Sequence, residues 1–276
     1  MKRIWILLLS IAAVLSLCAC RGEETMPLRI YFLDVGQGDA MLVRTEDGDL
    51  LIDAGTEESQ ETLCLRLEQL GVTELLLAVF THADGDHMGG ADGVLERFPT
   101  KEIWVSEELT ESESAKRLSA VLETTDTTLT RVRSGMILRV GAVVLSVLYP
   151  LTEEDDGGNE NSIVLKLHYQ NFDALLMGDV GAKQEKQILE TYGASQLACD
   201  LYKVGHHGSN TSSSAEFLAA VKPIYAIIGC GAANSYGHPT GEVLERLAAT
   251  GAEVLRTDLS GELLFETDGE TLFWRK

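Results

Sequence analysis

The sequence predicts a single α/β (α+β) domain built as a four-layer αββα sandwich, with two sheets face to face and helices on both outer surfaces. Strand-like and helix-like segments alternate from residue 28 to residue 276. Residues 50–55 and 174–179 repeat one pattern in the two halves, in which an apolar strand ends at a carboxylate and leads into a helix. Apolar residues make up 45% of the chain, which is enough for a large core.

The first half opens with three short predicted strands separated by glycine-containing turns. A helix is predicted over residues 57–70, because Leu63, Leu67 and Leu70 recur at helical spacing before Gly71. The other predicted elements are strands at residues 28–35, 40–44, 49–52, 75–80 and 103–105, helices at residues 94–98 and 111–123, and a β region over residues 127–149 with a turn at Ser134-Gly135.

The second half resumes this alternation after an acidic, glycine-containing loop at residues 152–161. Residues 162–168 and 174–177 are predicted to pair as strands. The other predicted elements are helices at residues 182–192, 213–221 and 242–249, and strands at residues 201–204, at residues 224–228 and at the end of the chain.

The N-terminus has the features of a bacterial lipoprotein signal peptide. A basic start and the apolar residues 4–17 lead to Cys20 in a sequence that resembles a lipobox, so Cys20 is the predicted lipidation site. An uncleaved membrane anchor is the alternative. In both cases the domain is expected outside the cytoplasm. If the segment is a lipoprotein signal peptide, the protein is predicted to be lipid-anchored to the bacterial cell membrane. The predicted divisions are a signal peptide over residues 1–20, a tether over residues 21–27 and one folded domain over residues 28–276.

The formal net charge of −21 restricts the partners of this chain. It keeps the protein soluble and repels polyanions at long range. No cluster of lysine and arginine could serve as a nucleic-acid arm, so a polyanionic substrate would be held mainly by local groups and metals. Cys64, Cys199 and Cys230 are too few for a disulfide framework and are predicted to be small buried hydrophobic residues.

The loop that follows the predicted strand at residues 75–80 carries four metal-ligand side chains, His82, Asp84, Asp86 and His87. Four such groups in a small volume are costly unless a cation compensates them, so the loop predicts a site for two divalent ions. Imidazole suits zinc, manganese or iron, and carboxylates favour harder ions, so zinc or manganese is expected and magnesium is possible. A polar, solvated loop is the alternative.

Candidate ligands and catalytic groups recur at three other predicted strand or helix ends. Asp179 follows an apolar strand and can bridge two metal ions, with a helix N-cap as the alternative. His206 and His207 follow another strand, where one can bind metal and the other can contact substrate. His238 lies in a turn before the helix at residues 242–249 and has a structural role as its alternative.

Hydroxyl and amide side chains join the two histidines to the next predicted helix. Ser209, Asn210 and Thr211 are the predicted substrate-binding residues of this segment, because hydroxyls and free amides at a helix N-terminus form an anion site. Such a site suits a phosphoryl group near the metals. Plain N-capping, which needs only one of these residues, is the alternative.

These motifs together resemble the metallo-β-lactamase superfamily, whose usual motif is H-x-H-x-D-H. Within it, the chain is similar to the C-terminal extracellular domain of ComEC-type competence (DNA-uptake) proteins, over roughly residues 28 to 276. The segments that carry the resemblance are residues 32–40 (FLDVGQGDA), 82–87 (HADGDH), 161–165 (NSIVL), 178–179 (GD), 203–209 (KVGHHGS), 234–239 (NSYGHP) and 256–258 (RTD).

The resemblance implies a set of metal ligands. His82 and Asp84 would hold the first ion. Asp86 and His87 would hold the second, and Asp179 would bridge the two. The last ligand is His206 or His238, with His206 preferred, and His207 and His238 would then face the substrate.

Other residues receive supporting roles from the same resemblance. Asp53 would orient a ligand histidine, and Asp34, together with Gln37 and Asp39, would line the rim of the site without an assigned role. Asp84 stands where the usual motif has its second histidine, so an oxygen-rich first site would favour manganese or magnesium. Asn161 or Ser162 would lie near the usual third histidine and contact substrate.

The predicted function is a surface-tethered, metal-dependent phosphodiesterase or nuclease of ComEC-like type. Two ions would lower the pKa of a water, and the resulting hydroxide would attack phosphorus or a carbonyl carbon while Asp86, His207 or His238 handles the proton. The expected substrate is single-stranded DNA or a small or cell-wall phosphodiester, the membrane is contacted through the N-terminal lipid, and no protein partner is evident. The alternatives are a lactam or lactone (amide or ester) hydrolase on the same dinuclear site and a non-catalytic metal- or partner-binding lipoprotein.

Overall fold

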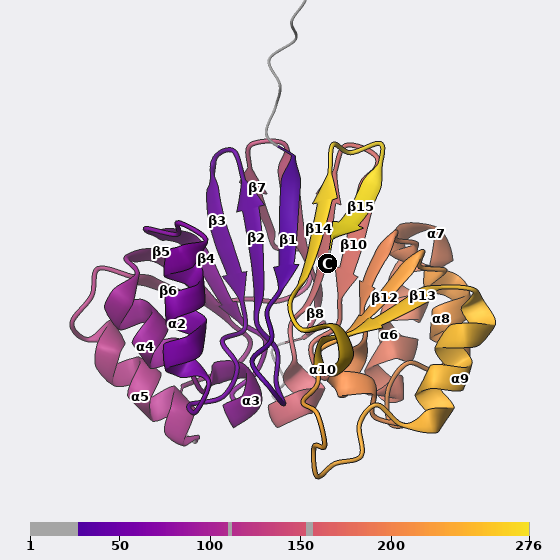
Figure 1. Ribbon diagram of the computed structural model, residues 1–276. Helices are drawn as coiled ribbons and strands as arrows, with labels where there is room; N and C mark the ends of the chain where they lie inside the picture. Colours follow the sequence, from indigo (N-terminus) through magenta and orange to yellow (C-terminus); the bar gives the residue numbers. More distant parts are fainter. Residues whose placement is uncertain (1–26, 110–111, 153–156, 276) are drawn as a thin grey trace, which may run out of the picture.

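The computed structural model describes residues 27–109, 112–152 and 157–275, and it confirms the αββα prediction. Two mixed sheets pack face to face in a single domain, and helices cover the outer surface of each sheet (Figure 1). In the described part of the chain, no helix has both the length and the apolar character needed to cross a membrane. The predicted signal peptide, Cys20 and residues 21–26 of the predicted tether lie outside the described residues.

The first sheet contains eight strands among the described residues, in the order β15-β14-β1-β2-β3-β4-β5-β6. Neighbours from β3 to β6 are parallel, and the other pairs are antiparallel. Helices α2 (Gln60–Gln69), α4 (Ala91–Arg97) and α5 (Glu113–Leu122) cover its outer face (Figure 1). Its strands are β1 (Leu28–Phe32), β2 (Met41–Thr45), β3 (Gly48–Ile52), β4 (Leu75–Phe80), β5 (Thr100–Val105), β6 (Thr128–Arg131), β14 (Leu263–Thr267) and β15 (Leu272–Arg275).

The second sheet contains seven strands among the described residues, in the order β13-β12-β11-β10-β9-β8-β7. The outer helices on this side are α6 (Ala182–Tyr192), α7 (Ala194–Leu197), α8 (Ala215–Val221) and α9 (Gly241–Thr250) (Figure 1). Its strands are β7 (Ile137–Val140), β8 (Val143–Tyr149), β9 (Val164–Tyr169), β10 (Phe172–Leu176), β11 (Leu201–Lys203), β12 (Tyr225–Ile228) and β13 (Glu253–Arg256).

Alternation along the strands produces three apolar layers. In β1, Leu28, Ile30 and Phe32 face the layer between the sheets, whereas Tyr31 faces the layer under the helices of the first sheet. Side chains of a strand point to opposite faces in turn, so a strand with apolar residues at every position is covered on both sides. This double burial explains why the strands of this chain read as continuous apolar runs.

The predicted elements at residues 75–80 and 182–192 match β4 and α6 at both ends. The predicted turn at Ser134-Gly135 is confirmed, and the chain there crosses from β6 in the first sheet to β7 in the second. The predicted return to strand at the chain end is also confirmed, but α10 (Thr257–Ser260), which was not predicted, separates β13 from β14. β14 and β15 then return to the first sheet beside β1.

Short helical turns at strand ends were not predicted. They are α3 (Gly85–Met88) after β4, η1 (Gly158–Asn161) before β9 and η2 (Gly205–Gly208) after β11. Both α3 and α10 lie at the lower edge of the sandwich in Figure 1, below the strands. The candidate site residues of the described chain come from these turns and from other loops that follow strands or precede helices.

Candidate metal centre and active site

The site lies where carboxyl ends of strands from both sheets meet. The β3 and β4 ends supply Asp53 and His87 from the first sheet, and the β10 and β11 ends supply Asp179 and His207 from the second. Parallel strands release their following loops at the same edge of a sheet, so residues far apart in the chain converge there. The structure places all six predicted metal ligands in this region, and their assignment as ligands stays a prediction.

His87 is fully buried and is held by Asp53. Its Nδ1 lies 2.8 Å from Asp53 Oδ2, so Nδ1–H donates to the carboxylate and Nε2 points into the site. Asp53 also accepts from the backbone N–H of Thr81 at 2.8 Å and from its hydroxyl at 2.9 Å. This geometry is the one expected for a carboxylate that orients a ligand histidine, as the resemblance implied for Asp53.

His207 approaches from the second sheet with the same ring atom forward. Its Nδ1 lies 2.8 Å from the carbonyl oxygen of Gly229, and a carbonyl can only accept, so Nδ1 carries the proton. The Nε2 atoms of His87 and His207 then face each other at 3.2 Å. Two ring lone pairs at this distance repel each other unless a proton or a metal cation lies between them.

Carboxylates complete this group of donors. Asp39, His87, Asp179 and His207 each offer one ligand atom, and the four atoms lie within 4.8 Å of one another. Asp179 Oδ1 is 3.2 Å from His87 Nε2, and Asp86 Oδ2 is 3.2 Å from His207 Nε2. Asp179 is not the helix N-cap that was its alternative, because Gly181 holds that position.

The charges of the group are strongly coupled. Burial disfavours imidazolium, but the carboxylates of Asp179 and Asp53 outweigh burial and raise the pKa of His87 well above its usual range. Burial likewise opposes the ionised form of Asp179, yet the charges of His87 and His207 hold its pKa well below the usual value. A proton held between imidazole and carboxylate is the group that a metal cation replaces.

His82 and Asp84 form a second part of the same site. His82 is buried, its Nδ1 lies 3.2 Å from Ser162 Oγ, and its ring centre is 4.2 Å from that of His87. Its Nε2 is 3.7 Å from Asp84 Oδ2 and has no hydrogen-bond partner among the described residues. A buried, unpartnered imidazole nitrogen beside a half-exposed carboxylate fits a divalent ion, so the donor set of the whole region suits the predicted metals.

His206 lies at the edge of the group, although it was the preferred last ligand. Its Nε2 is 3.8 Å from Asp179 Oδ2, compared with 3.5 Å for His207 Nε2. Asn159 Nδ2 lies 3.2 Å from the same His206 nitrogen. His206 and His207 both have left-handed backbone conformations, with φ of +48° and +50°, and this turn sends His207 inward. The tight group of ligand atoms therefore contains His207, which was predicted to face the substrate.

Asp34 and Asp39 have different surroundings. Asp34 is exposed and accepts from the N–H of Gly36 at 3.2 Å, so it does not support a ligand histidine. Asp39 is buried, and its Oδ2 contacts the ammonium of Lys203 at 2.6 Å. The sequence analysis did not predict the ion pair between Asp39 and Lys203. The preceding glycine was the available signal, because a Cβ on Gly38 would lie 2.4 Å from the carbonyl oxygen of Asp86. Only glycine therefore lets the loop before Asp39 approach Asp86 this closely.

The predicted anion site at the start of α8 is occupied by the protein itself. The N–H groups of Ser213 and Ser214 both donate to the buried carboxylate of Glu185, and Ser214 Oγ caps the helix by accepting from Phe217 at 3.3 Å. This is the N-capping alternative. Thr211 Oγ1 instead lies 3.3 Å from His206 Nδ1. Ser209 bonds Thr211 through its hydroxyl at 2.9 Å, and Asn210 is exposed.

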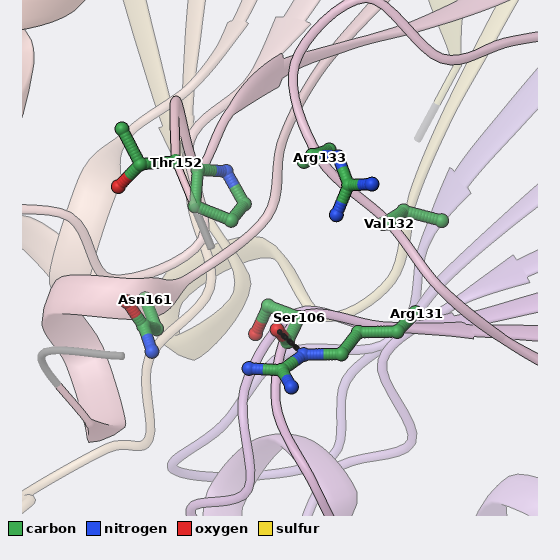
Figure 2. A pocket seen from close by; sticks show the side chains of 7 residues that line it. Ser106, Arg131, Val132, Arg133, Thr152 and Asn161 are labelled. Carbon is green, nitrogen blue, oxygen red and sulfur yellow. Dashed lines mark hydrogen bonds between the residues drawn. The ribbon is translucent and has the colours of Figure 1, made fainter. Parts of the chain in front are cut away.

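Asn161 and Ser162 separate the metal donors from a neighbouring cavity. Ser162 Oγ accepts from the backbone N–H of Asp179 at 3.0 Å and contacts His82. Asn161 lines a cavity of about 150 Å³ together with Arg131 and Arg133, whose guanidinium groups are visible in Figure 2. The other lining residues are Ser106, Val132, Pro150 and Thr152.

His238 forms part of an aromatic series at the mouth of the site. Its ring centre is 5.5 Å from that of His206 in an edge-to-face arrangement. On its other side it stacks with Tyr236 at 5.8 Å and an interplanar angle of 24°. The predicted substrate contact and catalytic role of His238 stay predictions.

Comparison with known proteins identifies the family. Residues 33–231 match the model of the metallo-beta-lactamase superfamily. The chain is 36% identical over 233 residues to competence protein ComA of Neisseria gonorrhoeae and 29% identical over 255 residues to ComE operon protein 3 of Bacillus subtilis. These alignments cover 84% and 86% of this chain but 31% and 32% of the relatives, so the chain spans about a third of their length.

Solved structures agree with this fold. The metallo-beta-lactamase fold protein YhfI from Bacillus subtilis superposes with a TM-score of 0.58 at 10% identity, covering 88% of this chain and all of that one. At this identity the similarity concerns the fold alone. The matched family model, the sandwich and the buried histidine–aspartate group lead to one conclusion: the chain belongs to the metallo-β-lactamase superfamily and is related to the ComA, ComEC and Rec2 competence proteins.

Proposed function

We propose that this protein is a metal-dependent hydrolase that cleaves phosphodiesters, in the manner of a nuclease or phosphodiesterase. One observation carries the proposal: two buried histidines direct their Nε2 atoms at each other beside the carboxylate of Asp179. Such a donor group is stable with a cation and unfavourable without one. The relationship to competence proteins supports a phosphodiester rather than a lactam as substrate.

The residues present can hold two ions. His87, His207, Asp179 and Asp86 would hold one, and His82 with Asp84 and Asp179 would hold the other. These residues would then place a divalent ion that would acidify a water molecule and stabilise negative charge on a phosphoryl group.

The protonation states of the surrounding side chains suit this chemistry. Burial raises the pKa of Asp86, but the hydrogen bond from His207 and the charges of His87 and His207 prevail and lower it to about 2. Asp86 is therefore a carboxylate at neutral pH, the form that a metal ligand must have. Burial lowers the pKa of His206 and of His238, so both rings are neutral at pH 7 and can orient a substrate that enters beside them.

The cavity beside Asn161 supports the choice of an anionic substrate. Arg131 and Arg133 bring two guanidinium groups to its wall in a chain whose net charge is −21. Guanidinium is the side chain best suited to phosphate oxygens. A substrate with more than one phosphate could thus contact the cavity and the metal donors together, with Asn161 and Ser162 between them.

Metal reconstitution tests the proposed function. Metal-stripped protein would receive manganese, zinc or magnesium singly and would then be assayed on a chromogenic phosphodiester, single-stranded DNA and a chromogenic β-lactam. We expect metal-dependent phosphodiester cleavage that Asp179→Ala and His207→Ala abolish. His168→Ala is the matched control, because His168 is a half-exposed histidine on β9 that pairs with Asp173 outside the site. Turnover of the lactam alone, or phosphodiester turnover that survives both substitutions, would contradict the proposal.

We also propose that the protein is exported and lipid-anchored through Cys20. The basic start, the apolar residues 4–17 and the lipobox-like sequence support this. Cells grown with a labelled fatty acid should label the wild-type protein. Cys20→Ser should abolish the label, whereas Cys18→Ser, a matched cysteine two residues away, should retain it. Equal labelling of both variants would refute lipidation at Cys20.

A further inference from the structure

An exposed aromatic ring leads from the solvent to the candidate metal centre. Tyr236 is 68% exposed, and one face of its ring stacks on His238 at 5.8 Å. His238 in turn contacts His206 at 5.5 Å, and His206 Nε2 lies 3.8 Å from Asp179 Oδ2. The series of rings therefore begins at the surface and ends at the metal donors.

The loop that presents Tyr236 is held in place by its own hydrogen bonds. The side chain of Asn234 donates to the carbonyl oxygens of Gly231 at 3.0 Å and His238 at 2.6 Å, and it accepts from the N–H of His238 at 3.0 Å. The N–H of Thr240 donates to the carbonyl oxygen of Gly208 at 2.9 Å, which joins the loop to η2. A ring that is already positioned loses little entropy when a ligand stacks on it.

The exposed ring of Tyr236 is joined to the candidate metal centre through His238 and His206. Its outer face is a flat apolar surface next to a hydrogen-bonding hydroxyl, which is the shape that binds planar aromatic rings. We propose that Tyr236 is a stacking platform for a nucleobase of the substrate, so that the substrate class is single-stranded nucleic acid or a nucleotide ester. This inference rests on the proposed phosphodiester hydrolysis, because the stacked base and the cleaved phosphate would belong to one chain.

The charge of the protein favours stacking as the source of affinity. Most nucleic-acid binding depends on lysine and arginine that displace counterions from phosphates, and a chain with 43 acidic and 22 basic residues has little of this. Base–aromatic stacking needs no net positive charge and tolerates every base, since each has a π face. We therefore expect binding to require nucleobases, to vary little with which base is present and to depend only weakly on salt concentration.

Binding without catalysis gives the first test. Calorimetric titration of the protein in EDTA would compare an oligothymidylate with an abasic oligomer of equal length, which has the same phosphates and no bases. We expect the wild-type protein to prefer the oligothymidylate, and Tyr236→Ala to reduce that preference about 5- to 100-fold, the range typical of one stacked base. Tyr236→Phe and Tyr236→Trp should retain the preference, because both keep a stacking face.

Turnover gives the second test. The esters would be thymidine 5′-(p-nitrophenyl phosphate) and methyl p-nitrophenyl phosphate, which share a leaving group and differ in the base. Tyr236→Ala should lower the ratio of their kcat/KM values, mainly through KM of the nucleoside ester. Phe273→Ala is the matched control, because Phe273 is a 55% exposed aromatic residue on β15, and the ratio should not change.

The two tests separate the inference from the proposed function. If neither ester is cleaved with any metal, the proposed function fails, while a base-dependent loss of binding in Tyr236→Ala would still support the platform. If the esters are cleaved but Tyr236→Ala alters neither the binding preference nor the kcat/KM ratio, the platform is refuted. Binding of an N-acetylglucosamine oligosaccharide through Tyr236, without binding of the oligothymidylate, would also overturn it in favour of a saccharide.

Discussion

The ammonium of Lys203 lies 2.6 Å from the carboxylate of Asp39, and both side chains are almost completely buried. Lys203 comes from β11 in the second sheet, and Asp39 follows β1 in the first. The lysine also donates to the carbonyl oxygen of Val204 at 2.9 Å. The ammonium of Lys203 therefore lies beside the metal donors and pairs with one carboxylate of the group, which leaves the others to compensate a metal ion.

Lys203→Met should lower the free energy of unfolding of the metal-free protein by about 3–5 kcal/mol, because it leaves Asp39 as a buried carboxylate without its partner. Urea denaturation would measure the loss. The double variant Lys203→Met/Asp39→Asn should recover part of it, since both charges are then removed. Arg29→Met, which removes a partly exposed partner of Glu266, should cost less than about 1 kcal/mol. If Lys203→Met and Arg29→Met lower the free energy of unfolding by similar amounts, the proposed importance of the buried Lys203–Asp39 pair is wrong.

Asp53→Asn should weaken metal binding by about 10- to 100-fold, because an amide has one acceptor oxygen and cannot accept from both the Thr81 N–H and His87 Nδ1–H, so the ring loses its orientation. Calorimetric titration with manganese or zinc would measure this. Asp173→Asn is a matched control, since Asp173 pairs with His168 at the same 2.8 Å on the surface of the second sheet. If the two substitutions have equal effects, the proposed role of Asp53 is wrong.

Glu185→Ala should release the loop that carries His206 and His207. It orphans the N–H groups of Ser213 and Ser214, at about 1–3 kcal/mol for each buried group left without a partner. Hydrogen exchange should accelerate at these two amides. Glu216→Ala, an exposed glutamate in the first turn of α8, should leave their exchange unchanged.

The same carboxyl gives a pH-dependent prediction. Burial raises the pKa of Glu185 above its usual 4.5, against the hydrogen bonds from Ser214 and Ser213. A carboxyl with a raised folded-state pKa favours the folded state when protonated, and this contribution falls as pH rises through its pKa. Relative to the wild type, Glu185→Gln should therefore be less destabilising at about pH 7 than at about pH 4. Denaturation at the two pH values would check this, and the opposite trend would contradict it.

The three cysteines of the described chain should react slowly with alkylating reagents. Burial raises the pKa of the Cys64 thiol to about 11, and burial with the neighbouring Asp258 raises that of Cys230 to about 11. Only about one such thiol in a thousand is ionised at pH 8, and the thiolate is the reactive form. Peptide mass spectrometry after alkylation should show low modification until the protein is unfolded. Rapid modification of the native Cys230 would contradict this.

The sequence predicted most of the local structure because the relevant signals are local. β4 is a continuous apolar run that ends at a cluster of ligand side chains, and both its bounds and its position beside the site were predicted correctly. α6 was also predicted at both ends. The spacing of apolar residues and the residues that end a helix or strand are properties of neighbouring positions. They can therefore be recognised without knowledge of tertiary contacts.

The sheet to which a strand belongs was not readable in the same way. Residues 127–149 look like one β region, but the structure divides them between the two sheets at Ser134 and Gly135. β14 pairs with β1 at the other end of the chain, with Leu28 opposite Thr267 and Phe32 opposite Leu263. Pairing of this kind depends on contacts between distant segments, which no local pattern specifies.

The sequence by itself determined the family, the αββα class and the histidine–aspartate loop whose side chains are those of metal ligands. Only the tertiary structure decided which groups meet. The left-handed backbone at His206 and His207 turns the second ring inward, and the packing of the two sheets brings Lys203 to Asp39. The sequence alone does not distinguish the roles of two adjacent histidines. Their roles differ in the folded protein because the backbone fixes the direction of each ring and each Nδ1 has its own hydrogen-bond partner.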